Sequence, residues 1–349
     1  MGDHTLHDDP EAWFHVRAAL HVETQLLFHL NQAGVFQHLD RRGPSTAGEM
    51  AEALGLVPHV LEVALDYVVG VDNLLERRPD DRFAVSPFGE RILDRYGRDT
   101  RGGRVFNFFD VRAGAYGPVW AGFGDMLSGE APYGQGVVRS GEHAANALYK
   151  SAQSFAPVLN RIIGESACGA AVEFGVETGL LEHVHRAHPQ LTLHGVDRSE
   201  QALASSEAHA AQEGVSGIQW IQSDLFDCAG WSEALPNDGP GVFFTIHMHE
   251  FLAAGMDAVS GLLTAIRERY PGWRLIVLEQ PRLPATAREE LPTAQWLYSQ
   301  ANVLIHHLIR NGRILSDPEW TELLASSGRE TTRSMPADFL DYRAYVVQL

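Results

Sequence analysis

Two histidines and a glutamate follow an apolar run near residue 245. The run GVFFT leads into His247, His249 and Glu250, and a stretch rich in alanine and leucine comes next. This pattern predicts a strand that ends at the polar residues and is followed by a helix. Ligands of open α/β sheets bind at the carboxyl ends of the strands. The three side chains are therefore candidates for a metal site, an acid–base site or a polar loop.

A second pair of histidines, His306 and His307, lies near the end of a predicted helix at 291–311. Neither histidine lies on the main apolar stripe expected for this helix, which consists of Leu297, Ala301, Leu304, Ile305 and Leu308. A histidine near a helix C-terminus can simply interact with the helix dipole. Together with His249 and Glu250, one of the two could instead complete a set of two histidines and one carboxylate. Such a set leaves open coordination positions and suits divalent iron or zinc.

A turn with two glycines follows an earlier apolar run, AAVEFG at 170–175. From Glu173 the chain reads EFGVETG, so that Gly175 and Gly179 lie between a predicted strand and a predicted helix. Glycines at such a turn let a ligand approach the backbone closely. The alternative is that they only shape a tight turn.

Acidic residues end the next two predicted strands. Asp197 ends LTLHGVD, 22 residues after Gly175, where a carboxylate can bind the diol of a ribose. Asp224 ends GIQWIQSD and precedes Leu225, at a place that can meet the edge of an adenine. The aspartates could also be helix caps. Because three successive strand ends agree, we predict a nucleotide-like ligand here.

The elements that must position these residues alternate between strand and helix from about residue 165. Further strands are predicted at 241–247 and 274–280, and TTRSMPA and YRAYVVQL predict a closing pair. This alternation predicts a doubly wound, Rossmann-like parallel sheet with helices on both faces, an α/β fold. The pattern before residue 150 is mostly helical. We therefore expect a helical dimerisation domain at 1–150 and a Rossmann-like domain at 151–349.

The first domain has the rhythm of a winged helix. An apolar helix is predicted at 12–39, then a short helix capped by Ser45 and ended by Gly55, then a helix from about Pro58 to Val69 and a hairpin arm, RFAVS. The second short helix, VPHVLEVALDYVV, has none of the lysines or arginines of a DNA-reading helix. One small domain cannot cover the long apolar helix, so we expect a homodimer.

The composition argues against several classes of partner. The 349 residues carry a formal net charge of −18, which disfavours nucleic acid and anionic membrane surfaces. No apolar run approaches the ~20 residues of a membrane-spanning helix. The N-terminal MGDHTLHDDPEAW is too acidic and polar for a signal peptide. Cys168 and Cys228 show no CxxC spacing, so we expect a reduced, cytoplasmic setting.

These motifs resemble the class I S-adenosylmethionine (SAM)-dependent methyltransferases, and more narrowly the small-molecule enzymes with an N-terminal winged-helix dimerisation domain. The resemblance runs from about residue 12 to the end of the chain. It implies that SAM is bound by Glu173, Gly175, Gly179, Asp197 and Asp224, with Leu225 beside them. The family loop usually reads acid-x-Gly-x-Gly-x-Gly, and Glu177 takes the middle glycine position here. A carboxylate there could repel the carboxylate of SAM or bind its ammonium group.

In O-methylating members of this family, a histidine after the fourth strand is the general base, and His249 occupies that place. The stretches IHMHEFL and LIHHL look more like the metal-dependent C-methyltransferases of phenylpyruvate-type 2-oxo acids. That resemblance implies His249, Glu250 and His306 as ligands of divalent iron or zinc, with His249 and Glu250 catalytic and His307 in reserve.

Arginine suits a substrate carboxylate, because its planar guanidinium donates two parallel hydrogen bonds. Arg139, in GVVRSGEH, is the first candidate, and Arg112 and Arg310 are alternatives.

We therefore expect a SAM-dependent methyltransferase of bacterial specialised metabolism, such as antibiotic biosynthesis, that methylates C3 of a 2-oxo acid through a metal-chelated enolate. One alternative is an O-methyltransferase with His249 as general base. Another is an isomerase, lyase or cyclase that keeps the fold but no longer methylates, which Glu177 would favour. A dimeric binding protein is disfavoured by the acidic charge.

Overall fold

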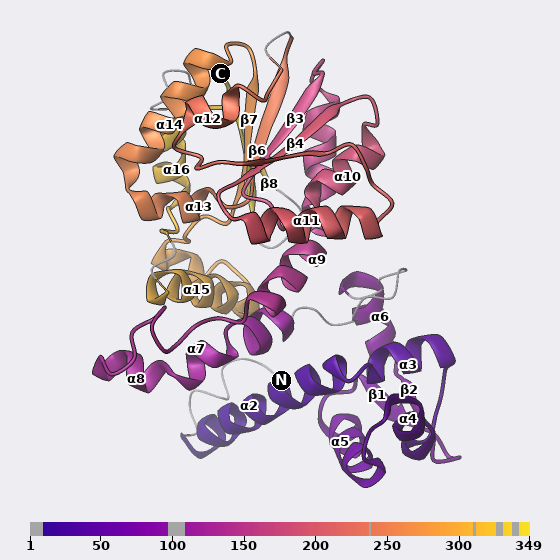
Figure 1. Ribbon diagram of the computed structural model, residues 1–349. Helices are drawn as coiled ribbons and strands as arrows, with labels where there is room; N and C mark the ends of the chain where they lie inside the picture. Colours follow the sequence, from indigo (N-terminus) through magenta and orange to yellow (C-terminus); the bar gives the residue numbers. More distant parts are fainter. Residues whose placement is uncertain (1–9, 97–108, 237–238, 310–311, 326–330, 337–341) are drawn as a thin grey trace. The chain divides into compact units, whose positions relative to one another are not determined.

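The computed structural model describes residues 10–96, 109–236, 239–309, 312–325, 331–336 and 342–349. The chain divides into two compact units, Met1–Ala147 and Leu148–Leu349 (Figure 1). In the described parts, no helix is long and apolar enough to cross a membrane. Cys168 and Cys228 are free thiols. The cytoplasmic location expected from the sequence stays a prediction.

The N-terminal unit has the predicted order of helix, turn, helix and hairpin. Its elements are α2 (Pro10–Gln32), α3 (Val35–Arg42), α4 (Ala47–Leu54), α5 (Pro58–Val71), β1 (Leu75–Arg77), β2 (Phe83–Val85) and α6 (Pro87–Tyr96). After the gap follow the π-helix η1 (Asp110–Ala115), α7 (Gly117–Ala121), α8 (Phe123–Ser128) and α9 (Gly141–Gly164), which continues into the second unit. Strands β1 and β2 pair antiparallel and form the wing.

The predicted helix at 12–39 is in fact two helices. Gly34 lies between α2 and α3 with a φ of 83°, a left-handed conformation that ends the first helix and that glycine adopts without strain. The chain turns there, and α3 buries Val35, Phe36 and Leu39 in the core of the unit. The apolar spacing continues across the break because both helices bury one face in the same core.

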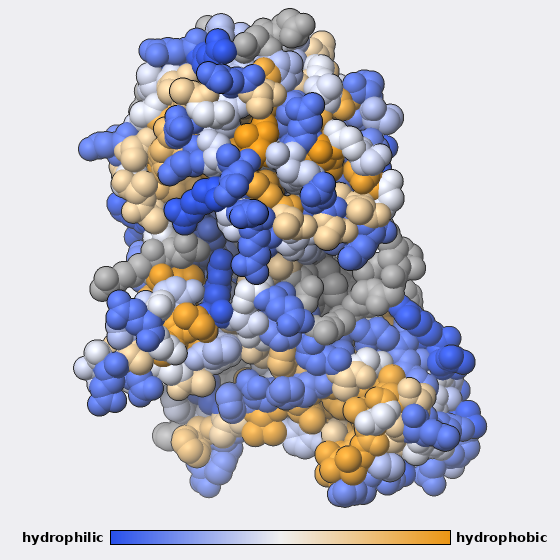
Figure 2. All heavy atoms as spheres, viewed as in Figure 1, coloured by the Kyte–Doolittle hydropathy of each residue, from blue (hydrophilic) through white to orange (hydrophobic). Residues whose placement is uncertain are grey.

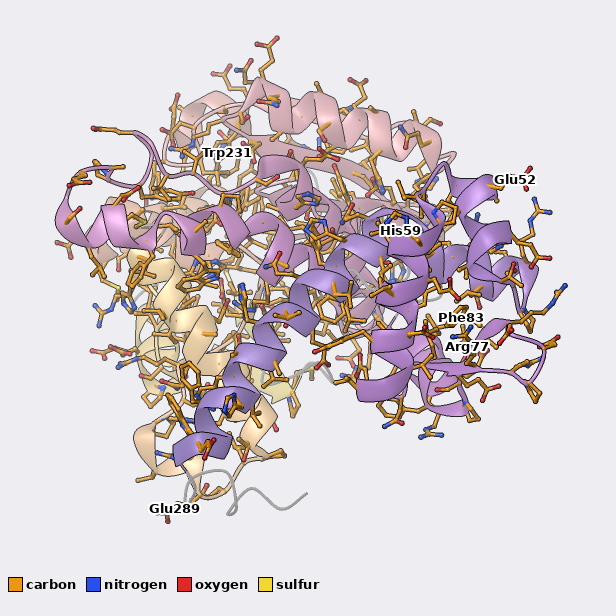
Figure 3. The ribbon with its side chains drawn as sticks, turned by 90° about the horizontal axis from the view of Figure 1, so that it is seen from below. Glu52, His59, Arg77, Phe83, Trp231 and Glu289 are labelled. Atoms are coloured by element: carbon orange, nitrogen blue, oxygen red, sulfur yellow. The ribbon has the colours of Figure 1, made fainter. Side chains whose placement is uncertain are left out.

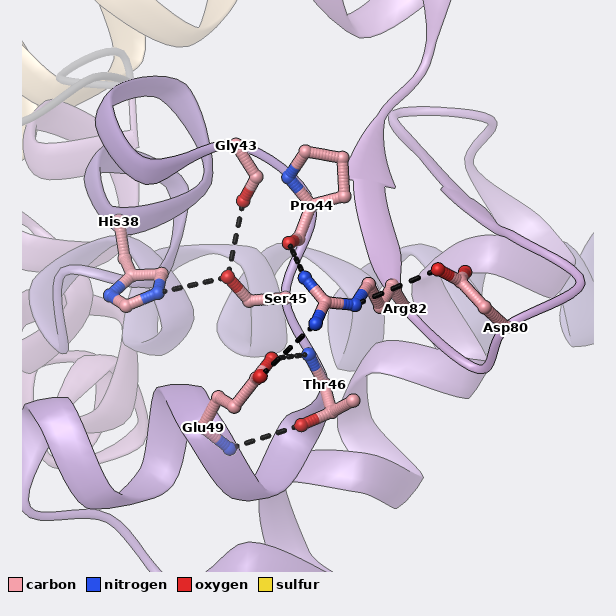
Figure 4. A network of polar contacts seen from close by, with 8 residues as sticks. All are labelled: His38, Gly43, Pro44, Ser45, Thr46, Glu49, Asp80 and Arg82. Carbon is pink, nitrogen blue, oxygen red and sulfur yellow. Dashed lines mark hydrogen bonds and ion pairs between the residues drawn. The ribbon is translucent and has the colours of Figure 1, made fainter.

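The cap of α4 is one residue later than predicted. Thr46, not Ser45, is the N-cap: its hydroxyl accepts from the Glu49 amide, and the Glu49 carboxylate accepts from the Thr46 amide (Figure 4). The Ser45 backbone instead bridges to Phe83, and its hydroxyl donates to the Gly43 carbonyl. Gly55 ends α4 as predicted, with a φ of 69°.

The arginines of the hairpin are engaged within the unit. Arg82 donates to the Pro44 carbonyl and forms ion pairs with Glu49 and Asp80 (Figure 4). Arg77 lies beside Phe83 in Figure 3, with its guanidinium carbon 5.2 Å from the ring centroid. These basic side chains therefore tie the hairpin to its own unit.

The second unit is built on one seven-stranded sheet in the order β5-β4-β3-β6-β7-β9-β8. Strands β3 to β7 are parallel, β9 is antiparallel to β7, and β8 is antiparallel to β9. The bounds are β3 (Ala170–Phe174), β4 (Thr192–Asp197), β5 (Gln219–Gln222), β6 (Gly241–Thr245), β7 (Arg274–Glu279), β8 (Thr331–Pro336) and β9 (Arg343–Gln348). The predicted α/β fold, including its closing pair of strands, is confirmed.

Helices cover both faces of this sheet (Figure 1). Alternating residues of β3 explain why, since Val172 points into one apolar core and Ala171 into the other. One core is closed by α12 (Cys228–Ser232), α14 (Met256–Arg269) and α16 (Asp317–Ala325), and the other by α9, α10 (Leu180–Ala187) and α11 (Glu200–Gln212). Each large apolar side chain buried this way contributes about 1.5–3 kcal/mol.

Candidate active site

The candidate site lies where the parallel strands end. Because β3 to β7 run the same way, their carboxyl ends share one edge of the sheet, and the polar residues that follow them gather there. This edge carries the glycine turn after β3, Asp197 at the end of β4, Asp224 after β5, and the short helix α13 (Met248–Phe251) after β6. Tertiary structure thus brings together residues from four separate stretches of sequence.

His249 is held by a carboxylate that the sequence interpretation missed. Glu279 is the last residue of β7, next to β6 in the sheet, and only 1% of it is exposed. Its two carboxylate oxygens each lie 2.9 Å from Nδ1 of His249, and one of them also accepts from the His249 amide. The sequence did contain an indication of this contact. RLIVLEQ predicts a buried strand, and a charged residue at its carboxyl end is costly to bury unless it is paired.

The backbone of His249 is fixed on its other side by Gly312. The Arg313 amide donates to the His249 carbonyl at 3.0 Å, and Gly312 packs directly against α13. A Cβ on Gly312 would lie 1.7 Å from the His249 carbonyl oxygen, and its φ is +82°. Only glycine fits this position. Gly312 and Arg313, which follow α15 (Thr293–Leu308), therefore fix the backbone of His249.

His306 lies against His249. The two ring centroids are 4.5 Å apart, with the rings at 73° to each other, and His306 is buried beside Ile305. The predicted apolar stripe of this helix was wrong, because Leu297 and Leu304 are 59% and 48% exposed. A histidine such as His306 can be buried on the packed face of a helix when it contacts another polar side chain. The spacing of apolar residues in the sequence does not reveal such a contact.

His307 points elsewhere. It is exposed, and its Nδ1 donates to the Val303 carbonyl of the preceding turn at 3.0 Å. Of the two adjacent histidines, the structure therefore places His306 beside His249 and leaves His307 at the surface.

The predicted metal set is not assembled. The Glu250 carboxylate lies 3.9 Å from Nδ1 of His247. Throughout the described ranges, no group of three or more His, Cys, Asp or Glu side chains is arranged to hold a metal ion. The residues present thus do not fit the expected three-ligand site for iron or zinc. The structure therefore does not support the divalent metal expected from the resemblance.

His247 has a structural place behind the glycine turn. It is 9% exposed, and its amide donates to the Thr245 hydroxyl. Gly175 has a φ of 76°, and a Cβ on it would lie 3.2 Å from the His247 ring. The close approach of the turn to this ring gives a second reason for glycine there.

The glycine turn is held by side chains on both sides. The Val176 amide donates to Asp197, and the Thr178 hydroxyl donates to Glu173 and accepts from the Leu180 amide. Glu173 is 1% exposed, and burial raises the pKa of its carboxyl well above the usual range. The hydrogen bond from Thr178 lowers this pKa, whereas the charges of Glu182 and Asp197 raise it further.

The residues predicted to bind an adenosine group lie at the end of β4 and just after β5. Asp197 is half-buried there, and Asp224 is exposed, with its carboxylate accepting from the Phe226 amide at 2.9 Å. Leu225 is buried in the core, so only its backbone faces the edge. The ring of Phe226, which the sequence interpretation did not single out, is 37% exposed next to Asp224. Two carboxylates that accept hydrogen bonds and one aromatic ring fit the diol, the amino edge and the ring face of an adenosine.

Two of the three arginine candidates, Arg139 and Arg112, lie in the N-terminal unit. Arg139 donates to the Tyr116 hydroxyl at 3.5 Å. Arg112 instead lines a cavity of about 1070 Å³, formed by α2, η1, α7 and the start of α9. Arg310 lies outside the described residues.

That cavity combines aromatic and hydrogen-bonding side chains. Phe28 and Trp120 line it, together with His143, whose Nδ1 lies 3.2 Å from the fully buried carboxylate of Asp110. Asp110 also accepts from Gln32. The buried acid therefore fixes the orientation of the His143 ring at the cavity wall.

Comparison with known proteins identifies the fold. No family model matches the chain. The tetracenomycin polyketide synthesis 8-O-methyl transferase TcmO of Streptomyces glaucescens is 26% identical over 251 residues, which cover 68% of this chain and 69% of that protein. The solved structure of the mitomycin 7-O-methyltransferase MmcR is 19% identical, with a TM-score of 0.69 over 97% of this chain and 98% of MmcR.

Two further solved structures agree. Human N-acetylserotonin methyltransferase in complex with SAM gives a TM-score of 0.68 at 17% identity, covering 100% of this chain and 99% of that one. The pyocyanin biosynthetic protein PhzM gives 0.69 at 16% identity, covering 97% and 99%. The chain has the fold of the SAM-dependent methyltransferases. The predicted fold, with its helical N-terminal domain, is thereby confirmed.

Proposed function

We propose that the protein is a SAM-dependent methyltransferase that methylates a hydroxyl group of a small molecule, with His249 as the general base. The observation that carries the proposal is the contact of His249 Nδ1 with both carboxylate oxygens of Glu279, each at 2.9 Å. The 26% identity to TcmO, an 8-O-methyl transferase by its name, supports transfer to oxygen.

The pair of side chains suits proton abstraction. A carboxylate can only accept, so His249 carries its proton on Nδ1 and presents the lone pair of Nε2. Nε2 removes the proton of the acceptor hydroxyl as the oxygen becomes a nucleophile. The Glu279 carboxylate then stabilises the imidazolium ring. When bound, SAM supplies the electrophilic methyl group.

We assign the binding of SAM to the edge formed by the glycine turn, β4 and β5. Asp197 would accept hydrogen bonds from the ribose diol, and Asp224 and Phe226 would meet the adenine. The glycine turn, with Gly175 and Gly179, would lie along the methionine part. Gly175 and Gly179 have φ values of 76° and 75°, which supports a turn shaped for close approach.

The acceptor in this proposal is a hydroxylated aromatic molecule of specialised metabolism. The cavity of about 1070 Å³ in the N-terminal unit supports this class, since it is at the upper end of the size of small-molecule sites. Phe28 and Trp120 offer apolar surface to rings, and His143, held by Asp110, offers a hydrogen bond to a substituent. TcmO and MmcR are named for tetracenomycin polyketide synthesis and for mitomycin, which supports an antibiotic-like acceptor.

A second candidate is C-methylation of a 2-oxo acid by a metal-dependent enzyme. The observation that favours it is the contact between His249 and His306, whose ring centroids are 4.5 Å apart and which could together ligate a metal ion. Against it stands the absence, among the described residues, of a group of three or more His, Cys, Asp or Glu side chains arranged to hold a metal ion.

One set of measurements separates the two candidates. The purified chain is analysed for metals, dialysed against a chelator, and assayed with SAM against hydroxylated anthraquinones and against phenylpyruvate. We expect methylation of the hydroxylated aromatic to persist after chelation and to be lost in His249→Ala. Stoichiometric iron or zinc, with chelator-sensitive methylation of phenylpyruvate, would instead establish the second candidate.

The cofactor assignment has its own test by calorimetry. Asp197→Ala removes charge-assisted hydrogen bonds of about 1.5–3 kcal/mol, so SAM affinity should fall about tenfold to a hundredfold. The control is Asp227→Ala, which removes the same charge from an exposed residue that caps α12. Equal losses in the two variants, or unchanged affinity in Asp197→Ala, would show that the cofactor site is misplaced.

A further inference from the structure

The cavity of the N-terminal unit has a histidine on its wall that is held by a buried acid. Nδ1 of His143 lies 3.2 Å from Oδ1 of Asp110, which is fully buried, while the His143 side chain is 22% exposed and lines the cavity. The same oxygen of Asp110 accepts from the side-chain amide of Gln32. This pair lies in a different unit from His249 and Glu279, and the proton abstraction proposed above does not involve it.

The packing around His143 fixes its ring. The ring centroid lies 5.3 Å from that of Phe28, with the two rings at 73° to each other. A Cβ on Gly114 would lie 2.7 Å from Cγ of His143 and 3.0 Å from the Phe28 ring, so both rings pack where only glycine leaves room. The orientation of the imidazole is therefore set before a ligand binds, which reduces the entropy lost on binding.

The segment that carries Asp110 and Gly114 has an uncommon backbone. Residues Asp110–Ala115 form the π-helix η1, and π-helical turns are rare and occur frequently at functional sites. Asp110 begins this turn and is fully buried, whereas Ala113 and Gly114 of the same turn line the cavity. This backbone is a second observation, independent of the histidine, that favours a ligand site here.

The remaining wall of the cavity suits a flat aromatic ring. Part of it is a stripe of α2 whose members, four residues apart, share one face of the helix: Leu20, Thr24 and Phe28. Small residues of η1 and α7 leave room elsewhere on the wall: Gly114, Gly117 and Ala121. Trp120, which is 37% exposed, is a second aromatic side chain of the lining. Aromatic rings pack favourably on such side chains, so the cavity fits a planar aromatic ligand.

The contact with Asp110 decides which hydrogen bond His143 makes at the cavity. Oδ1 of Asp110 accepts from Gln32, so it acts as an acceptor, and Nδ1 of His143 carries the hydrogen between the two side chains. Nε2 of the neutral ring then has a lone pair and no hydrogen. A hydroxyl group satisfies such an acceptor. An ether or carbonyl oxygen does not, because it has no hydrogen to donate.

We infer that His143 is a specificity-determining residue, through which the cavity selects aromatic ligands with a free hydroxyl group over their methyl ethers. Nε2 of His143 accepts the hydrogen bond of the hydroxyl, and Asp110 is a positioning residue that keeps the ring in the accepting tautomer. The inference rests on the proposed function only in taking the acceptor molecule as the natural ligand. The recognition itself requires neither SAM nor His249.

Calorimetric titration without SAM tests the role of His143. The full chain and His143→Phe are each titrated with 2-hydroxyanthraquinone and with its methyl ether, 2-methoxyanthraquinone. The full chain should bind the hydroxyl compound about tenfold more tightly, the upper scale of one net hydrogen bond. His143→Phe keeps an aromatic ring but cannot accept, so the ratio of the two affinities should fall to about one while the affinity for the ether changes little.

Asp110→Asn tests the tautomer separately. The asparagine amide can donate to Nδ1, which moves the ring hydrogen to Nε2, and a donor there bonds a hydroxyl and an ether oxygen alike. The ratio of affinities should again approach one. The melting temperature shows whether each variant is folded, and His143→Phe decides the outcome if Asp110→Asn is not. His59→Phe, at an exposed position of α5, is the matched control and should leave the ratio unchanged.

The outcomes distinguish this inference from the proposed function. If the full chain prefers the hydroxyl compound through His143 but methylates no hydroxylated aromatic, the proposed function is overturned and the inference stands. If the chain methylates such compounds and His143→Phe keeps the original ratio, or shifts it no more than His59→Phe does, the inference alone is wrong. Equal affinity of the unmodified chain for the two compounds, or binding of neither, would also overturn it.

Discussion

Nδ1 of His249 lies 2.9 Å from each carboxylate oxygen of Glu279, and the His249 amide donates to the same carboxylate at 2.8 Å. One buried acid therefore fixes both the backbone and the ring of the histidine. The helical turn α13 and the end of β7 act as one unit through this contact.

Replacing Glu279 should impair catalysis more than cofactor binding. In Glu279→Gln the amide no longer selects the Nδ1–H tautomer or stabilises the imidazolium, so kcat should fall about a hundredfold or more, the usual scale of general-base catalysis. The SAM dissociation constant from calorimetry should stay within about threefold of the original value, because the acid lies at the end of β7 and not at β4 or β5.

Glu250→Gln is the matched control, since Glu250 faces His247 at 3.9 Å. We expect a smaller effect on kcat there. If Glu250→Gln abolishes turnover while Glu279→Gln retains it, the acid–base pair is assigned to the wrong carboxylate.

Gly312→Ala should displace His249, although Gly312 itself is not one of the proposed catalytic residues. The new Cβ would lie 1.7 Å from the His249 carbonyl oxygen, and the φ of +82° adds strain. The backbone of α13 or of residue 312 must move, so we expect the loss of several kcal/mol of stability or of most of the activity. Thermal unfolding and kcat together measure both effects.

Gly214→Ala is the control that separates backbone strain from steric collision. Gly214 has a φ of +70°, but a Cβ there would meet only open space. The substitution should cost only about 1–2 kcal/mol and leave kcat intact. Equal behaviour of the two variants would argue against a specific contact between Gly312 and His249.

We expect the protein to be a homodimer formed through its first 100 residues. On α2, Phe14, Leu20 and Val22 are 63%, 51% and 54% exposed, and exposed apolar side chains gathered on one helix are typical of an interaction surface. Figure 2 shows hydrophobic residues gathered over α5 as well, where Val60 and Val63 are 57% and 69% exposed.

Light scattering at micromolar concentration should give twice the chain mass of 38.5 kDa. The double variant Phe14→Glu with Val22→Glu should shift the protein towards monomer, because charges cannot be buried in an apolar interface. Leu127→Glu, 72% exposed on α8, should not. A monomeric unmodified chain would contradict the prediction outright.

The stability of the N-terminal unit should depend on pH through Asp72. Burial, with the neighbouring carboxylate of Glu23, raises the pKa of Asp72 from 3.8 to about 6. The folded state thus binds this proton more tightly than the unfolded state, so its stabilising contribution is complete below pH 4 and is lost as pH rises through 6.

Asp72→Asn should therefore stabilise the protein at pH 7.5, by about 1 kcal/mol once the partial exposure of the group is allowed for, and make little difference near pH 4. Urea denaturation at both pH values measures this. Asp125→Asn, at an exposed site in the same unit, should show no such dependence. A destabilising effect of Asp72→Asn at pH 7.5 would contradict the assignment.

The order of elements was readable from the sequence because it depends on local patterns. The buried strand AAVEFG, the positions of Asp197 and Asp224 at strand ends, and the helix stop at Gly55 all follow from apolar spacing and from the conformations that single residues favour. Gly34 shows the limit of such patterns: the apolar spacing of 12–39 continues through a left-handed break.

Which side chains meet was decided by the tertiary structure. His249 has Glu250 beside it in the sequence, yet its carboxylate partner is Glu279, thirty residues away, because β6 and β7 are neighbours in the sheet. His306 and His307 are adjacent, and only His306 turns towards His249, since successive residues of a helix point about 100° apart. A sequence names the residues able to do chemistry; sheet order and helix rotation, which depend on contacts between distant segments, select the ones that do.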